Sequence, residues 1–201
     1  MERGHTINTL IQHALALGVS DARVIAVEEI SVEDHLAEMC GEQRCNGYGL
    51  SAHCPPHVMK PGQFREYLKE YKLALVFKFD VPTEILMSDE RLEITRMLHE
   101  IAAGIEQSAL ENGYTTVQGL AGGSCKRLFC NEYDTCSVLT GEGDCRFPAV
   151  ARPSMSGVGI NFFALSNALG WQITKITTDT NPDDTPMGLL AGMVLLGILG
   201  T

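Results

Sequence analysis

Four cysteines lie close together in residues 120–153, and cysteine thiolates are the side chains best suited to bind soft metals. They are Cys125, Cys130, Cys136 and Cys145. Four sulfurs in so short a span usually share a metal or cluster, or pair as disulfides. Four glycines in the same segment give the backbone the freedom to turn several sulfurs inward. Since the segment can bury little apolar surface, we expect coordinate or covalent bonds to hold it.

A second set of three cysteines lies upstream, and the two sets together contain every cysteine of the chain. Its members are Cys40, Cys45 and Cys54. Three thiolates are one ligand short of a closed tetrahedral site. Candidates for the fourth ligand are His53 and His57, which flank a Cys-Pro-Pro sequence, and then, less favoured, Tyr48 and Glu42. The alternatives are that both histidines are ordinary loop residues, or that the fourth position is open to water or substrate, as in catalytic sites.

Three kinds of chemistry fit these cysteines, and an iron–sulfur cluster is favoured. Such clusters are held by thiolates, and ferredoxin-like sequences often place a proline just after a ligand, as Cys54-Pro55 does here. Zinc sites more often contain two tight Cys-x-x-Cys pairs, which this chain lacks. Redox-active or simply buried cysteines would be scattered through helices and strands. We therefore predict one or two clusters, of the [4Fe–4S] type, with zinc as the alternative.

Basic residues stand beside the four-cysteine set and are candidates for contacts to a bound cluster. They are Lys126, Arg127, Arg146 and Arg152. A thiolate-ligated cluster is anionic, and neighbouring positive charge lowers thiolate pKa values and raises the cluster potential. The alternative is that these side chains are solvated surface charges.

The bulk composition predicts one globular domain over residues 1–201. The chain is 45% hydrophobic and 20% charged, with a net charge of -10. That charge argues against nucleic acid or an anionic membrane as a partner, since phosphates would be repelled. The N-terminus lacks the pattern of a secretory signal, so we expect a cytoplasmic protein with reduced thiols. The uncharged C-terminal run is too short and glycine-rich for a membrane span and predicts a buried strand, paired within the sheet or across a homo-oligomer.

Hydrophobic periodicity predicts the elements that position the cysteines. Helices are expected at residues 6–17, 31–39, 61–71 and 88–112 and after Pro153. Strands are expected at residues 22–30, 73–81, 115–120, 171–179 and 188–199. This order predicts an α/β (α+β) fold: a single domain with one mixed β-sheet of about five strands, packed helices, and cysteine-rich metal-binding loops on the connections.

The cysteine motifs also resemble those of a known family. The pattern C-x4-C-x8-CPP, followed by GGSC and CRFP and then RPSM with GIN, is similar to a widespread prokaryotic family of cysteine-rich predicted metal-binding proteins of unknown function. The resemblance covers the chain from about Ile25 to the C-terminal strand and implies metal binding through the seven cysteines. Here the second set is expanded to CKRLFCNEYDTC, whereas many relatives have a compact form.

The family description names no reaction, so the functional hypotheses come from the site. The leading hypothesis is electron transfer, or delivery of electrons to a redox partner protein. The second is an enzyme in which a cluster with an open iron serves as Lewis acid or redox centre. The third is a zinc-stapled interaction module, which chelators would unfold.

Overall fold

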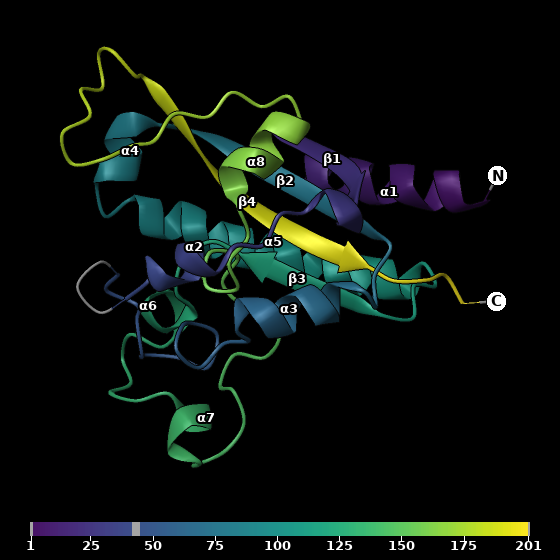
Figure 1. Ribbon diagram of the computed structural model, residues 1–201, viewed down its shortest axis with the longest axis horizontal. Helices are drawn as coiled ribbons and strands as arrows, with labels where there is room; N and C mark the ends of the chain where they lie inside the picture. Colours follow the sequence, from purple (N-terminus) through teal and green to yellow (C-terminus); the bar gives the residue numbers. More distant parts are fainter. Residues whose placement is uncertain (1, 42–44, 201) are drawn as a thin grey trace.

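A computed structural model describes residues 2–41 and 45–200, and its centre is one four-stranded β-sheet. The strands are β1 (Asp21–Ala26), β2 (Leu73–Pro82), β3 (Val117–Ala121) and β4 (Met187–Leu196). Their spatial order is β1-β2-β4-β3, and every neighbouring pair is antiparallel (Figure 1). The two central strands pair along their full length, from Leu73 opposite Leu196 to Pro82 opposite Met187.

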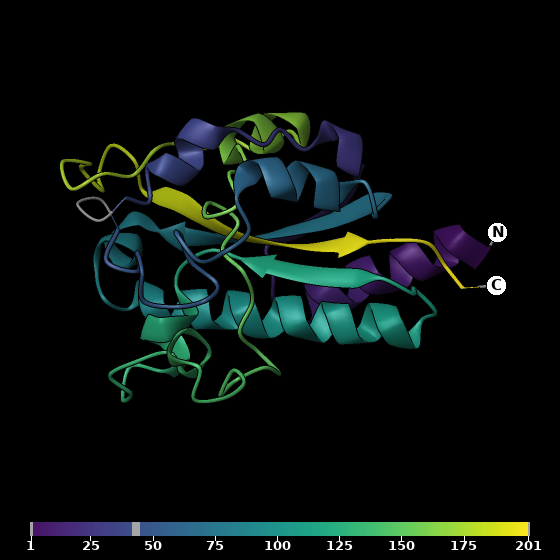
Figure 2. The same cartoon turned by 60° about the horizontal axis from the view of Figure 1, so that its bottom comes forward.

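Helices cover both faces of this sheet. In the described residues they are α1 (Glu2–Ala16), the 3-10 turn η1 (Val27–Glu29), α2 (Asp34–Glu38), α3 (Pro61–Leu68), α4 (Thr83–Met87), α5 (Arg91–Glu111), α6 (Cys125–Phe129), α7 (Ser137–Thr140) and α8 (Phe162–Ala168). The long helix α5 lies with α1 on one face, and α3 and α8 lie on the other (Figure 2).

The central strands are mostly apolar, with Lys78 and Asp80 as the charged exceptions on β2, because both of their faces are buried along most of their length. On β2, Ala74 and Val76 face the α3 and α8 side, whereas Leu75 and Phe77 face α5. This alternation follows from the two-residue repeat of a strand. Strand β4 behaves in the same way, which confirms that the uncharged C-terminal run is a buried strand. Among the residues that the structure describes, no helix combines the length and apolar character needed to cross a membrane.

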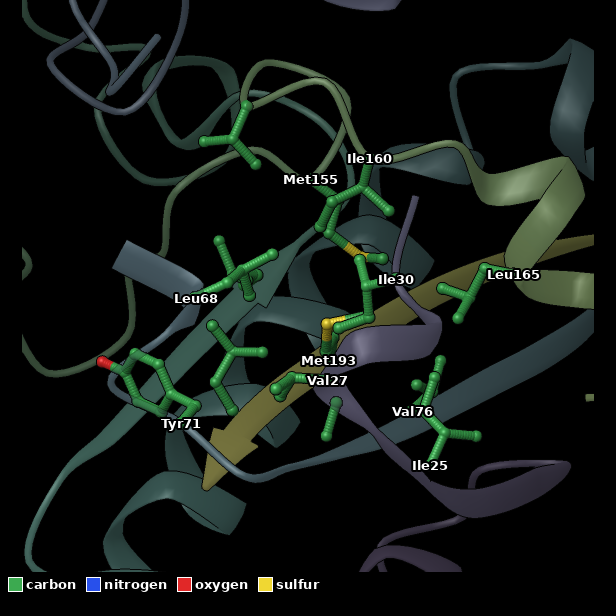
Figure 3. Close-up of a cluster of buried hydrophobic side chains, with 14 of the residues drawn as sticks. Ile25, Val27, Ile30, Leu68, Tyr71, Val76, Met155, Ile160, Leu165 and Met193 are labelled. Atoms are coloured by element: carbon green, nitrogen blue, oxygen red, sulfur yellow. The ribbon is translucent and has the colours of Figure 1, made fainter. Parts of the chain in front are cut away.

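The core on the α3 and α8 side anchors the chain that leaves residues 120–153, which we call the four-cysteine segment. Figure 3 shows Met155 and Ile160 pointing toward Met193 of β4 and Ile30, which follows η1. Met155 and Ile160 are at most 5% exposed. The exit of the segment is therefore fixed in the core, and its entrance is fixed by β3.

The α+β class with one sheet is confirmed, with two differences in detail. The sheet has four strands in the described part of the chain rather than about five, and its strand pairings are antiparallel, with one parallel bridge between Ala121 and Ser154. Residues 171–179 form no strand, because beyond the buried Trp171 they are largely exposed and turn at Thr177. The helix expected after Pro153 begins only at Phe162, where Asn161 caps it by accepting a hydrogen bond from the Ala164 amide.

Candidate metal centre

The two cysteine sets line two different pockets, as their separation in the sequence suggests. Cys40, Cys45 and Cys54 line a cavity of about 170 Å³, which we call the three-cysteine pocket. Cys125, Cys130, Cys136 and Cys145 line a cavity of about 30 Å³, the four-cysteine pocket. All seven are free thiols. The fold therefore gathers each set around its own space.

The three-cysteine pocket is formed where the connection between α2 and α3 meets the start of α6. The Gly47 amide donates a hydrogen bond to the Cys45 sulfur at 3.4 Å, and the Cys40 sulfur lies 4.0 Å from the Ser156 hydroxyl. A side chain at Gly47 would come within 2.7 Å of the Ser124 Cβ. The close approach of the backbone to α6 thus requires glycine at this position.

The two pockets are neighbours, because Ser51 lies beside a sulfur of each. Ser51 is 2% exposed, and its hydroxyl faces both Cys54 and Cys125. Ser124 faces Cys54 as well. In the described ranges, neither serine hydroxyl has a hydrogen-bond partner of regular geometry. Both donors are available to a sulfur that carries negative charge.

Burial holds several of these thiols in the protonated form. It raises the pKa of Cys125 to about 12, although the Ser51 hydroxyl opposes the rise, and it also raises the pKa values of Cys40 and Cys54. Cys136 is the exception: burial alone would raise its pKa, but the backbone amides of Ala52, Leu139 and Val138, together with Arg146, lower it. Because metals bind the thiolate, protons are released on binding and affinity falls as the pH falls.

Helix α5 fixes both ends of the four-cysteine segment. The fully buried His99 lies with Nε2 3.1 Å from the Gly122 carbonyl oxygen, and its Nδ1 accepts a hydrogen bond of 3.1 Å from the Arg152 amide. Glu106, two turns further on, forms an ion pair of 3.0 Å with Arg152 and accepts a hydrogen bond from the Gly119 amide. The start and the end of the segment are thus both held to one helix.

The four basic residues named from the sequence are placed in three different ways. Lys126 and Arg146 line the four-cysteine pocket, and both bind backbone carbonyls: Lys126 those of Cys130 and Tyr133, Arg146 that of Thr135. Arg127 lines the three-cysteine pocket instead. Arg152 lines neither sulfur pocket and donates to the carbonyls at the end of the segment. Lys126 and Arg152 are 9% exposed, so neither is a solvated surface charge.

The candidates for a fourth ligand of the three-cysteine set are also separated. His53 lies on the other side, with Nδ1 3.6 Å from the Cys125 sulfur, and it lines the four-cysteine pocket. His57 is exposed and lines a cavity beside α3. Tyr48 does line the three-cysteine pocket. Glu42 lies outside the described residues.

The donor set of both pockets is thiolate sulfur, which suits zinc, copper(I) and iron–sulfur clusters. Within residues 2–41 and 45–200, no three His, Cys, Asp or Glu side chains are placed so that they could hold one metal ion. The sulfurs instead surround the two pockets, with buried serine donors and lysine or arginine side chains at the walls. These residues fit a thiolate-bound metal or cluster by their chemistry.

Four residues of the centre were not identified from the sequence: Ser51, Ser124, His99 and Glu106. A serine in a loop carries no signal in a single sequence. His99 and Glu106 could have been found, because they are seven residues apart and thus share the buried face of α5. Two polar side chains on a helix face that packs against the sheet require partners.

We expect the protein to lose stability on acidification because His99 is neutral when buried. Burial lowers the pKa of His99 from 6.5 to about 4. The unfolded chain binds a proton below pH 6.5 and the folded chain only near pH 4, so stability present above pH 6.5 is lost as the pH falls through that window. The loss amounts to about 3 kcal/mol. Denaturant titrations of the metal-free protein at several pH values would measure it. In His99→Gln this part of the pH dependence should be absent; an equal slope in both proteins would contradict the assignment.

Alanine at Gly123 should destabilise the entrance of the four-cysteine segment. Gly123 has a φ of +82°, and an added Cβ would lie 2.5 Å from Cγ2 of Thr95, whose hydroxyl is held by the Arg91 carbonyl at 2.7 Å. Left-handed strain and overpacking together predict a loss of about 2–4 kcal/mol in the free energy of unfolding. Gly141→Ala is the matched control, since its φ is +72° with no atom within 4 Å of the added Cβ. Chemical denaturation should show a clearly smaller loss for the control; equal losses would rule out the contact with Thr95.

Comparison with known families gives one result for this chain. The family model described as "Predicted metal-binding protein (DUF2284)" matches residues 23–196. That range contains all seven cysteines and the four strands almost completely. Searches of curated proteins and of solved structures give no match. The family match confirms the resemblance inferred from the cysteine motifs.

Proposed function

The chain belongs to this family of predicted metal-binding proteins, and from that premise we propose that it is an iron–sulfur protein acting in electron transfer. The observation that supports the proposal most directly is the separation of seven free thiols into two adjacent pockets of four and three. Thiolates are the usual protein ligands of such clusters. Two neighbouring sites fit a protein that passes electrons from one centre to another.

In this proposal each residue of the centre has a stated role. The four thiolates of the second set would hold a [4Fe–4S] cluster in the four-cysteine pocket, and the three of the first set would hold a second cluster. The hydroxyls of Ser51 and Ser124 face the sulfurs and stabilise their charge. Lys126 and Arg146 line the four-cysteine pocket and add positive charge to it. When bound, a cluster supplies reversible one-electron redox chemistry at a potential set by these neighbours.

The surface around the four-cysteine pocket suggests the charge of a redox partner protein. Four exposed acidic residues surround α7: Glu132, Asp134, Glu142 and Asp144. Figure 1 shows α7 projecting from the rest of the fold. Because opposite charges steer weak, transient encounters, a partner with a basic docking face is favoured.

The decisive experiment is metal and sulfide analysis of protein purified without oxygen. We expect brown protein with about four iron atoms and matching acid-labile sulfide per occupied set. Reduction should bleach the visible absorption and produce an EPR signal. The variant Cys136→Ala/Cys145→Ala should lose the iron of one set, whereas Leu139→Ala, an exposed side chain of α7 that lines neither cysteine pocket, should keep it. Colourless protein with stoichiometric zinc would overturn the proposal.

One observation favours zinc as a second candidate. The cavity lined by the four thiols measures about 30 Å³, against about 170 Å³ for the three-cysteine pocket, and a single ion requires less room than a cluster. In that case the four-cysteine segment is a zinc-stapled module. Zinc would be retained under air, and the protein would show no redox-dependent signal.

A further inference from the structure

The three-cysteine pocket has room beside its thiols, unlike its neighbour. Its volume is about 170 Å³, against about 30 Å³ for the four-cysteine pocket. Three thiolates also leave one coordination position of a bound metal without a protein ligand. The pocket therefore has both the space and the open position that a small ligand requires.

The charge of this pocket is opposite to that of the whole protein. Arg91, at the start of α5, and Arg127, on α6, both line it. None of its lining residues among those described is an aspartate or glutamate. In a chain with a net charge of -10, two arginines in a pocket with no carboxylate among its described lining residues mark a local site for negative charge.

Several hydrogen-bond donors of the pocket are unused. The Arg127 side chain makes no hydrogen bond or ion pair within the described part of the chain, and Arg91 uses one nitrogen, which donates to the Ser88 carbonyl at 2.7 Å. Guanidinium groups present a fork of N–H donors that matches carboxylate and phosphate oxygens.

We propose that the three-cysteine pocket is a substrate site, in which Arg91 and Arg127 bind the carboxylate or phosphate group of a small anionic molecule. The position of the ligand next to a metal rests on the proposed function; anion binding by the two arginines does not.

The test is calorimetric titration of anoxically purified full-length protein with two probes, inorganic phosphate and succinate. We expect saturable binding of at least one probe, weakened about tenfold in Arg127→Gln. Arg91→Gln provides a second variant in case the first fails to fold. Lys69→Gln removes an equal charge from exposed surface on the far end of α3 and should bind as the unaltered protein does. Binding of phosphate alone or succinate alone identifies the group that is recognised.

A second readout reports proximity to the metal. In protein that contains iron, the bound probe should change the EPR signal of the three-cysteine site, and in Arg127→Gln the change should require about tenfold more probe. No binding of either probe to iron-loaded protein, or binding unaffected by both arginine variants, would overturn this inference and leave the proposed function intact. Absence of iron together with arginine-dependent anion binding would overturn the proposed function and leave the anion site intact.

Discussion

Replacing Arg152 with leucine should lower the free energy of unfolding by about 3–5 kcal/mol, because it leaves the largely buried Glu106 carboxylate without its ion-pair partner. The two side chains are 10% and 20% exposed, and they are joined at 3.0 Å. Arg152 also donates to the carbonyls of Pro148, Ala149 and Ala151, so the end of the four-cysteine segment loses its attachment at the same time. Urea denaturation of the metal-free protein would give the value.

The comparison variants separate the ion pair from ordinary packing. In Arg152→Leu/Glu106→Leu no uncompensated charge remains, and we expect part of the loss to be recovered. Arg65→Leu is the surface control, since the ion pair between Arg65 and Asp34 is largely exposed; it should change stability by less than about 1 kcal/mol. A loss of that small size for Arg152→Leu itself would show that the buried pair does not hold the segment.

Removal of the metal should loosen the four-cysteine segment without unfolding the sheet. Neither apolar core contains a residue between Gly122 and Ser154 among those described. Most of residues 131–149 are exposed, whereas β2 and β4 are buried in both cores. The segment therefore has little apolar burial to replace lost metal bonds, and local opening is the expected response.

Hydrogen exchange followed by mass spectrometry would measure this effect. In chelator-treated protein we expect exchange in residues 130–150 to accelerate by about tenfold or more, with β2 and β4 nearly unchanged. Restoring the metal should restore protection, and the matched internal control is the peptide that contains β2. Loss of protection in β2 and β4 to the same extent would show that the metal holds the whole fold, as in a small zinc-stapled module.

Prediction from the sequence worked best where the signal is local. The apolar runs at residues 73–81 and 188–199 and the helical repeat of residues 88–112 correspond to β2, β4 and α5 within a few residues. It failed at residues 171–179, where a β-branched composition resembles a strand but the segment is mostly exposed beyond Trp171 and pairs with no strand in the described part of the chain. The β-propensity of a segment describes how well its side chains fit a sheet, but a strand forms only where another strand is available to pair with it.

The sequence by itself predicted metal binding by thiols: two sets of cysteines outside the strands, in a chain whose periodic segments build a helix-covered sheet. The expectation that all seven lie on loops was wrong for Cys125, which is the first residue of α6. Only the tertiary structure decided which groups meet. His53 lines the four-cysteine pocket, although it is next to Cys54 in the sequence. Arg127 lines the three-cysteine pocket, although it is two residues after Cys125. Side-chain direction in a loop depends on turns and long-range packing, and the residues that fix these, such as His99, lie far away along the chain.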